Sequence, residues 1–360
     1  MIIEIEALDT LFFRDGKPFE KGDDVWATGM FPPLPSVIYG ALRSAYLGQN
    51  DIALDEVEAA TSGLRIQKIW YKIQSVNDQG GTSYSYLPMP LDLVQKKSLS
   101  RAEKIRVEDY ALYPTFSLEY ESTSFASSSQ NLMGSKVLTI DEDVETARDS
   151  FVTDLDFKNY LKGQSVNEIY QFAPKSEAKI GIARSDATRT TSEGNLYRVG
   201  MLRTNEVIIW VEFEGLELQK SGLLQLGGER KLARYKSPRS VVFPSTDLAS
   251  MEMENDIAFK LYLTTPAIFK NGYYPIEIFE KAKVNVELIT CAVGKPLKVG
   301  GFDMVKKQPK KMYRAVPAGS VYYYKLLSGN LGDLHSVVSN HSICEQRGQE
   351  GYGISFIGKI

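Results

Sequence analysis

The hydrophobic pattern changes its period twice within the first 75 residues of this 360-residue chain. Residues 2–7 alternate apolar and acidic side chains, which predicts an edge strand with one buried face. The prolines of residues 31–36 exclude a helix interior at that point. Ser36 then stands where an N-cap belongs, and apolar residues recur at helical spacing over residues 37–46. Residues 64–75 return to β-rich alternation, so the predicted order is strand, helix, strand.

A similar order recurs after a long irregular stretch. Residues 196–203 and 207–213 predict two strands joined as a hairpin around Thr204 and Asn205, and residues 216–224 predict a short helix. Further strands are expected at residues 239–243, 257–265, 283–293, 321–327 and 353–357. These patterns predict an α+β fold with two ferredoxin-like (RRM-like) domains, of which the second is reduced.

The length and the irregular stretch suggest where the domains divide. A chain of this length is expected to form two domains, at roughly 100–200 residues per domain. We expect an N-terminal domain at residues 1–248 with an insertion at about 76–180, and a C-terminal domain at 249–360. Within the insertion, residues 141–156 carry seven acids against one base. Because so many acids would repel RNA, we expect this run to face solvent or a basic partner subunit.

Composition narrows the class of protein. The net charge of −3 argues against a strongly basic, free-standing nucleic-acid binder. However, residues 295–314 carry seven bases and one acid, which predicts a local basic face. The two cysteines, Cys291 and Cys344, lie far apart in sequence, which favours a reducing compartment. No apolar run reaches the length of a membrane span and the N-terminus lacks a basic signal-peptide region, so we expect a cytoplasmic protein without a membrane partner.

Residues suited to catalysis are scarce. The two histidines, His335 and His341, both lie in the last tenth of the chain. The sequence contains no zinc-type cluster and no nucleotide-binding glycine motif. Asp9 and Asp15 could hold Mg²⁺, but an ion pair with Arg14 and a turn at Asp15 explain them better. We therefore expect no enzymatic activity, no metal and no cofactor, while catalysis by tyrosine and lysine without histidine stays open.

Glycine pairs followed by basic residues occur twice, at residues 226–236 and 298–314. Glycine lets a backbone approach a sugar-phosphate chain, lysine and arginine neutralise phosphates, and aromatic rings such as Tyr313 stack on unpaired bases. Arg43 joins the prediction, although it is also placed to form an ion pair on a helix surface. The predicted RNA-binding residues are Arg43, Gly227, Gly228, Arg230, Lys231, Tyr235, Lys298, Gly300, Gly301, Phe302, Lys306, Lys307, Lys310, Lys311 and Arg314.

Several blocks together resemble one family. Residues 7–19 and 31–43 resemble the N-terminal signatures of the third Cmr subunit of type III-B CRISPR effector complexes. The glycine-rich residues 351–353 resemble the C-terminus of the wider repeat-associated (RAMP) superfamily. Further similar blocks follow in order at residues 181–184, 195–197, 226–231, 299–302 and 316–322.

The resemblance implies a role in antiviral defence. It implies two ferredoxin-like domains with a glycine-rich loop, and a subunit that caps the 5′ handle of the guide RNA (crRNA). The implied neighbours are the large polymerase-type signalling subunit and the first backbone subunit, with target RNA only indirectly involved. It also implies no nuclease activity, and it offers no counterpart for the acidic run. The rival hypotheses are a RAMP endoribonuclease that processes precursor guide RNA and a scaffold that binds only protein.

Overall fold

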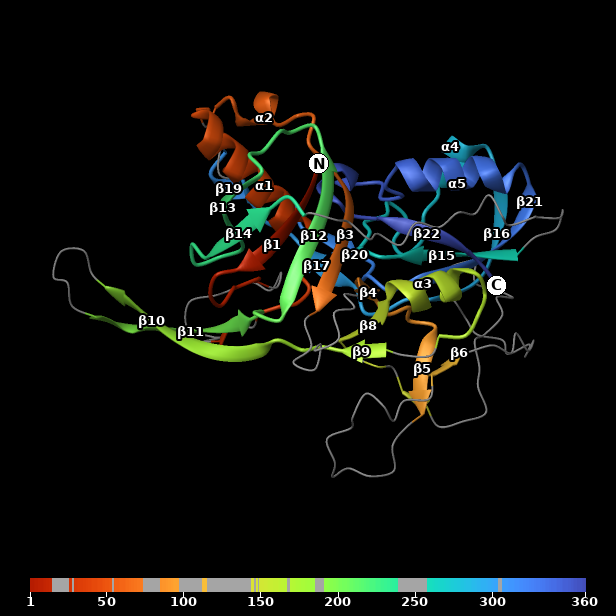
Figure 1. Cartoon of the computed structure of the whole chain (residues 1–360), viewed down its shortest axis with the longest axis horizontal. Helices are drawn as coiled ribbons and strands as arrows, with labels where there is room; N and C mark the ends of the chain where they lie inside the picture. Colours follow the sequence, from red (N-terminus) through yellow and green to blue (C-terminus); the bar gives the residue numbers. More distant parts are fainter. Residues whose placement is uncertain are drawn as a thin grey trace. The chain divides into compact units, whose positions relative to one another are not determined.

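The computed structural model describes residues 1–14, 26–27, 29–53, 55–73, 85–96, 112–114, 144–145, 147, 149–166, 169–184, 191–238, 258–303 and 306–360. The chain forms two compact units (Figure 1). Unit 1 contains Met1–Gly81, Ala173–Ser240 and Leu297–Arg314, and unit 2 contains Thr82–Phe172, Val241–Pro296 and Ala315–Ile360. The strand expected at residues 239–243, the domain boundary expected at residue 248 and Asp15 lie outside the described residues. Most of the expected insertion is grouped with unit 2, whereas residues 297–314 are grouped with unit 1.

In unit 1, one helix packs against a largely antiparallel sheet. Its strands follow the order β13-β14-β1-β12-β3. Because β1 pairs with both β12 and β14, the expectation of an edge strand at residues 2–7 is wrong. Helix α1 starts one residue before the expected cap, with Pro35 in its first turn, where a missing N–H costs nothing. The elements are β1 (Ile2–Ala7), α1 (Pro35–Asn50), α2 (Val57–Ala60), β3 (Arg65–Ile73), β12 (Val207–Glu214), β13 (Ser221–Gln225) and β14 (Leu232–Lys236).

A second sheet in unit 1 has three strands in the order β10-β11-β2, of which β10 and β11 form a long ribbon. Strand β10 (Lys175–Arg184) pairs antiparallel with β11 (Thr191–Arg203), and β11 pairs in parallel with the short β2 (Trp26–Ala27). The expected hairpin around Thr204 is therefore wrong, because β11 belongs to this ribbon while β12 pairs with β1 and β3. The tight turn is present, with Val207 N donating to Thr204 O at 2.9 Å, but it carries the chain from one sheet into another. The helix expected at residues 216–224 is also wrong, since β13 lies there.

Unit 2 contains a four-stranded antiparallel sheet of order β16-β21-β15-β22. Along the chain its elements alternate as strand, helix, strand, strand, helix, strand. The two helices pack on the same face, in a core that includes Phe259, Leu261, Tyr322, Leu334 and Ile357. The elements are β15 (Ala258–Leu263), α4 (Glu277–Ala282), β16 (Asn285–Ala292), β21 (Val321–Ser328), α5 (Leu331–Asn340), the 3₁₀ turn η4 (Gly348–Glu350) and β22 (Ser355–Lys359).

The segment expected to be an insertion adds small elements to unit 2. Strands β4, β8 and β9 are neighbours in that order, and β6, β5 and β7 form another sheet. The end of the acidic run is part of the folded structure, because Asp156 is buried and its backbone N–H donates to the Thr153 hydroxyl at 3.1 Å. The expectation that the acidic run faces solvent or a basic partner subunit is therefore wrong for Asp156. The elements are β4 (Tyr86–Pro88), β5 (Leu93–Lys96), β6 (Leu112–Pro114), β7 (Val144–Glu145), β8 (Ser150–Thr153), α3 (Asp154–Leu161) and β9 (Ile169–Gln171).

The glycine-rich C-terminal loop is fastened by its own contacts. Gly353 has a φ of +72°, and a Cβ there would lie 2.6 Å from the Cβ of Cys344. Arg347 and Glu350 form a largely buried ion pair with Nη2 and Oε2 2.6 Å apart. The Thr265 hydroxyl donates to Gly351 O at 2.8 Å. These contacts explain the glycines through packing within the chain.

The chain is a mixed α and β protein with mostly antiparallel sheets and few helices, which confirms the α+β fold class. Among the described residues, no helix is long and apolar enough to cross a membrane.

Candidate nucleic-acid interface

The described residues of 297–314, which leave out 304–305, form two nested strand pairs and are called here the basic hairpin. Strand β17 (Leu297–Val299) pairs with β20 (Tyr313–Ala315), and β18 (Phe302–Asp303) pairs with β19 (Gln308–Pro309). Between the two pairs, Lys310 N donates to Gly301 O at 2.9 Å. At the tip, Lys306 N donates to the Asp303 carboxylate at 3.0 Å. These backbone contacts order the segment that carries most of the predicted site.

The cations of the basic hairpin are exposed. Within the described part of the chain, none of the six forms an ion pair, and Lys311 instead lies with its Nζ 5.3 Å from the Tyr313 ring centroid. Cations without partners attract the phosphates of a nucleic acid. The six cations are Lys298, Lys306, Lys307, Lys310, Lys311 and Arg314.

Exposed apolar side chains and a glycine with positive φ accompany these charges. Phe302 is 54% exposed and Met312 is 53% exposed. Gly301 has a φ of +137°, which disfavours any side chain, and a Cβ there would meet only the Lys310 side chain, at 3.6 Å. At Gly300 a Cβ would lie 2.9 Å from the flexible end of Met312. The space outside Gly301 is therefore open to a close approach, with an aromatic ring beside it.

The other glycine pair is required by the protein's own packing. Gly227 has a φ of +79°, and a Cβ there would lie 2.4 Å from Phe12 O. Gly228 N donates to the same Phe12 oxygen at 2.8 Å. The next two residues, Glu229 and Arg230, also have positive φ. The glycines are therefore needed because the loop packs closely against the backbone of Phe12. The sequence alone does not reveal this contact.

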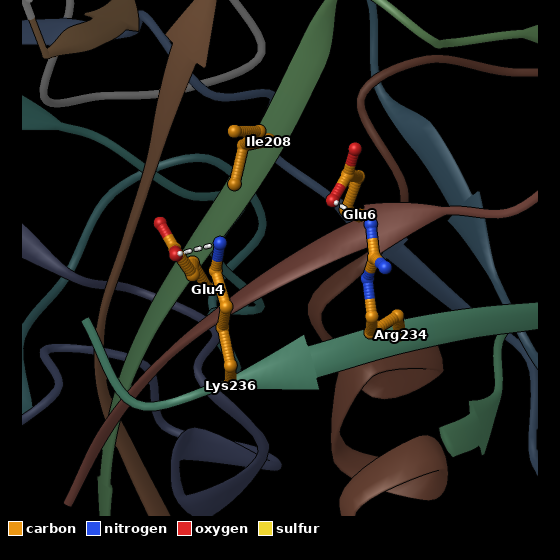
Figure 2. Close-up of a pocket in the computed structure, with 5 residues that line it drawn as sticks. All are labelled: Glu4, Glu6, Ile208, Arg234 and Lys236. Carbon is orange, nitrogen blue, oxygen red and sulfur yellow. Dashed lines mark hydrogen bonds and ion pairs between the residues drawn. The ribbon is translucent and has the colours of Figure 1, made fainter. Parts of the chain in front are cut away.

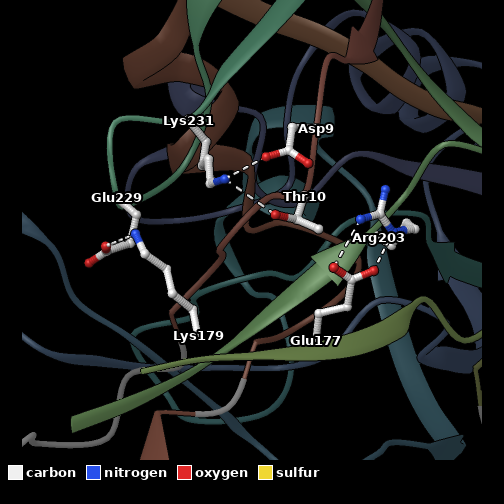
Figure 3. Close-up of polar contacts among 7 residues, drawn as sticks. All are labelled: Asp9, Thr10, Glu177, Lys179, Arg203, Glu229 and Lys231. Atoms are coloured by element: carbon white, nitrogen blue, oxygen red, sulfur yellow. Dashed lines mark hydrogen bonds and ion pairs between the residues drawn. The ribbon is translucent and has the colours of Figure 1, made fainter. Parts of the chain in front are cut away.

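Most charges around this loop are already paired (Figure 3). Lys231 Nζ lies 2.8 Å from the Asp9 carboxylate and 3.3 Å from the Thr10 hydroxyl. Lys179 and Glu229 pair at 2.9 Å, and Arg203 pairs with Glu177. The hydrogen bond from Lys231 lowers the pKa of Asp9. Asp9 thus pairs with Lys231, 222 positions away, and the alternative pairing of Arg14 with Asp15 lies outside the described residues.

Two predicted residues do not fit an RNA contact as placed. Tyr235 is fully buried, and its hydroxyl accepts a hydrogen bond from Gln49 of α1. No face of its ring is open to a base, so we leave it out of the interface. Arg43 pairs with Glu58 at 3.1 Å, which is the helix-surface ion pair considered above. Arg230 is exposed and has no ion-pair partner in the part of the chain that the structure describes.

Sequence reasoning missed a charge-balanced face of the unit 1 sheet (Figure 2). Side chains alternate along a strand, so Arg234 and Lys236 of β14 point away from the face on which Tyr235 meets α1. Lys236 pairs with Glu4 at 3.0 Å and Arg234 pairs with Glu6 at 2.9 Å. The period-two alternation of acids in β1 and bases in β14 was the signal that could have revealed it. Because these two acids and two bases pair with one another, the four side chains offer no excess charge to a phosphate chain.

The histidines lie apart from the basic hairpin in sequence and belong to unit 2. His335 Nε2 is 3.1 Å from the Ser339 hydroxyl, one turn along α5, and partial burial lowers the pKa of His335. His341 is exposed. Among the described residues, no three His, Cys, Asp or Glu side chains are grouped so that they could hold a metal ion.

The basic hairpin, whose cations form no ion pair among the described residues, has the local positive charge that is typical of nucleic-acid-binding surfaces. The model of the family "CRISPR-associated protein (Cas_Cmr3)" matches residues 3–360. The chain therefore belongs to the Cas_Cmr3 family, which confirms the resemblance to the third Cmr subunit.

Other comparisons are more distant. No curated protein matches the chain. One similar solved structure is described as the type III-B Cmr-beta bound to cognate target RNA and AMPPnP, with a TM-score of 0.49 and 16% identity over 90% of this chain and 86% of that one. A second, described as Cmr-beta bound to cognate target RNA, has a TM-score of 0.46 and 16% identity over the same shares.

Proposed function

We propose that this chain is a non-catalytic RNA-binding subunit of a type III-B CRISPR effector complex and that it holds the 5′ handle of the guide RNA. Family membership supports the assignment to the complex. The observation that carries the RNA-binding role is the basic hairpin, whose six exposed cations lack carboxylate partners in the described residues. A chain with a net charge of −3 needs such a local concentration of charge to attract RNA.

The chemistry of the basic hairpin fits a single strand. A single-stranded handle exposes both its phosphates and its base faces. The lysines and Arg314 neutralise phosphates, Gly301 permits close backbone approach, and Phe302 offers a ring on which one base stacks. Stacking of one base is worth about 1–3 kcal/mol. Arg230 and Lys231 contribute additional positive charge. The attraction of Lys231 for a phosphate is weakened by its hydrogen bond to Asp9.

The proposal extends to the folds and the neighbours of the chain. We assign each unit a ferredoxin-like domain, supported by the strand orders β14-β1-β12-β3 and β22-β15-β21-β16, which follow the same pattern. The domain limits 1–248 and 249–360 stay a proposal. The proposed neighbours are the large polymerase-type subunit and the first backbone subunit, in the cytoplasm.

The test compares two sets of charge changes in the assembled complex. One variant changes Lys306, Lys307, Lys310 and Lys311 to Ala. The matched control changes four exposed lysines outside the basic hairpin to Ala, namely Lys162, Lys220, Lys281 and Lys359, so that the net charge falls equally. Guides with native and scrambled handles are offered to both. We expect the hairpin variant to lose guide binding and the control to keep it; equal binding by both variants contradicts the proposal.

A second variant tests the handle itself. Gly300→Val/Gly301→Val keeps every charge but blocks the approach to the backbone at Gly301. We expect it to assemble less well on native handles and to discriminate less between native and scrambled ones. A folded variant that discriminates as well as the wild type would place handle recognition elsewhere in the complex.

A further inference from the structure

The sheet of unit 2 has a second face, opposite α4 and α5. Successive side chains of a strand point to opposite faces. Lys260 and Tyr262 of β15 therefore point away from the face that carries Phe259 and Leu261. In the register of the sheet, Lys260 lies beside Tyr323 of β21, and Tyr262 lies beside Phe356 of β22. This second face thus presents aromatic rings and a cation.

Helix α3 covers this face, and Figure 1 draws it on the side of β15 and β22 away from α4 and α5. The Phe157 ring centroid lies 5.7 Å from that of Tyr262 and 5.1 Å from that of Phe356. The Tyr160 ring lies edge-on to Tyr262 at 5.9 Å. At Gly358 a Cβ would come within 3.0 Å of the Leu161 Cα, so glycine allows the helix to sit directly on the strand.

A buried polar cluster joins this cover to the sheet. The Asp92 carboxylate accepts hydrogen bonds from the hydroxyls of Tyr160, at 2.8 Å, and Tyr323. Lys260 Nζ lies 3.5 Å from the Tyr160 ring centroid. All four side chains are buried, Asp92 and Lys260 at 2% exposure each. The Tyr262 hydroxyl in turn donates to Pro88 O, so the segment before Asp92 is held to the same strand.

We propose that helix α3 and the segment around Asp92 permanently cover one face of the unit 2 sheet, and that this face binds no RNA. It is the face that RNA-binding domains with such a sheet leave open. RNA-binding sheets of this kind stack bases on aromatic side chains of the open face. Here the rings of Phe157 and Tyr160 take the place of bases against Tyr262, and the Asp92 carboxylate takes the place of a phosphate near Lys260. The inference deepens the proposed function, since it confines RNA contact to the basic hairpin and the other exposed residues.

These contacts make helix α3 part of a packed core and not a movable lid. Phe157, Tyr160 and Leu161 are buried as deeply as the residues under α4 and α5. The side chain of Thr153 accepts a hydrogen bond from Asp156 N and so caps the start of α3. This cap stabilises the helix where it packs on the sheet. Opening would expose three apolar side chains and break a hydrogen-bonded cluster at once.

The test measures RNA binding and solvent protection on the full chain. Lys260→Met removes the buried cation while keeping most of the length of the side chain, and Tyr323→Phe removes one hydroxyl. We expect both to bind a single-stranded guide within about twofold of wild type, whereas the four-lysine hairpin variant loses at least tenfold. In wild type, hydrogen exchange of the β15 and β21 amides should be equally slow with and without RNA.

The outcomes separate this inference from the proposed function. A folded Lys260→Met or Tyr323→Phe chain that loses tenfold in RNA affinity overturns the inference, and so does RNA-dependent exchange in β15 of the wild type. The exchange measurement needs no variant, so it decides even if a substitution prevents folding. Unchanged affinity in the hairpin variant overturns the proposed function alone, because it leaves the closed face untouched.

Discussion

Replacing Asp92 with Ala tests how strongly helix α3 and the segment around Asp92 are held against the sheet of unit 2. The change leaves the buried hydroxyls of Tyr160 and Tyr323 without their acceptor and leaves the Lys260 cation without its nearest counter-charge. A buried hydroxyl without a partner costs about 1–3 kcal/mol. Breaking a buried ionic cluster by removing one member costs about 3–5 kcal/mol. Since these terms overlap, we expect a total of about 3–5 kcal/mol.

Native-state hydrogen exchange of the β15 amides measures this loss locally, which suits a chain of two units that need not unfold together. A loss of this size raises the exchange rate roughly a hundred- to several-thousand-fold. The control is Glu287→Ala, which removes an exposed carboxylate from the same sheet.

Adding Lys260→Met to Asp92→Ala should recover part of the loss, because the double variant no longer buries a lone cation. Exchange in Asp92→Ala that stays within about threefold of wild type would refute the reasoning. So would a double variant that is no more stable than the single one.

Three further predictions concern Gly227, Lys260 and the absence of RNA cleavage. Gly227→Val forces a side chain into a positive φ and within 2.4 Å of Phe12 O, so the melting temperature of the chain should fall sharply; an unchanged value would show that the loop moves freely. Burial lowers the pKa of Lys260 to about 8, so between about pH 8 and 9 the unfolded chain binds more protons than the folded one. Wild type should therefore gain about 1 kcal/mol of unfolding free energy over Lys260→Met across that interval, and parallel pH profiles would contradict this. The chain alone should leave repeat RNA uncut with or without Mg²⁺; cleavage that is lost in His335→Ala/His341→Ala would instead favour the endoribonuclease.

Local patterns predicted the elements whose identity depends on near neighbours. The strand at residues 2–7, helix α1 and strand β3 follow from alternation, proline placement and helical spacing. The position of β1 inside its sheet could not be predicted, since its partner β14 lies more than 220 residues later. The same limit explains the wrong hairpin at Thr204, where a correct turn joins two different sheets.

The candidate site, like the fold, was predicted only where local sequence decides the outcome. Exposure of the lysines in the basic hairpin followed from a local run of bases with one acid. The pairing of Lys231 with Asp9 required contacts across the whole fold, as did the seating of Gly227 on Phe12. Tyr235 was chosen as a stacking ring because it follows basic residues, yet alternation along β14 turns it inward toward α1. Period-two counting through residues 232–236 would have separated it from Arg234 and Lys236.

The salt dependence of RNA affinity tests the central claim most directly. For a single strand, the slope of log affinity against log salt changes by about 0.7 for each phosphate contact. If Lys306, Lys307, Lys310 and Lys311 each neutralise a phosphate, changing all four to Ala should reduce the slope by about 2.8, equally for any single-stranded sequence. The control variant at Lys162, Lys220, Lys281 and Lys359 should keep the wild-type slope. A hairpin variant with the wild-type slope would contradict the account.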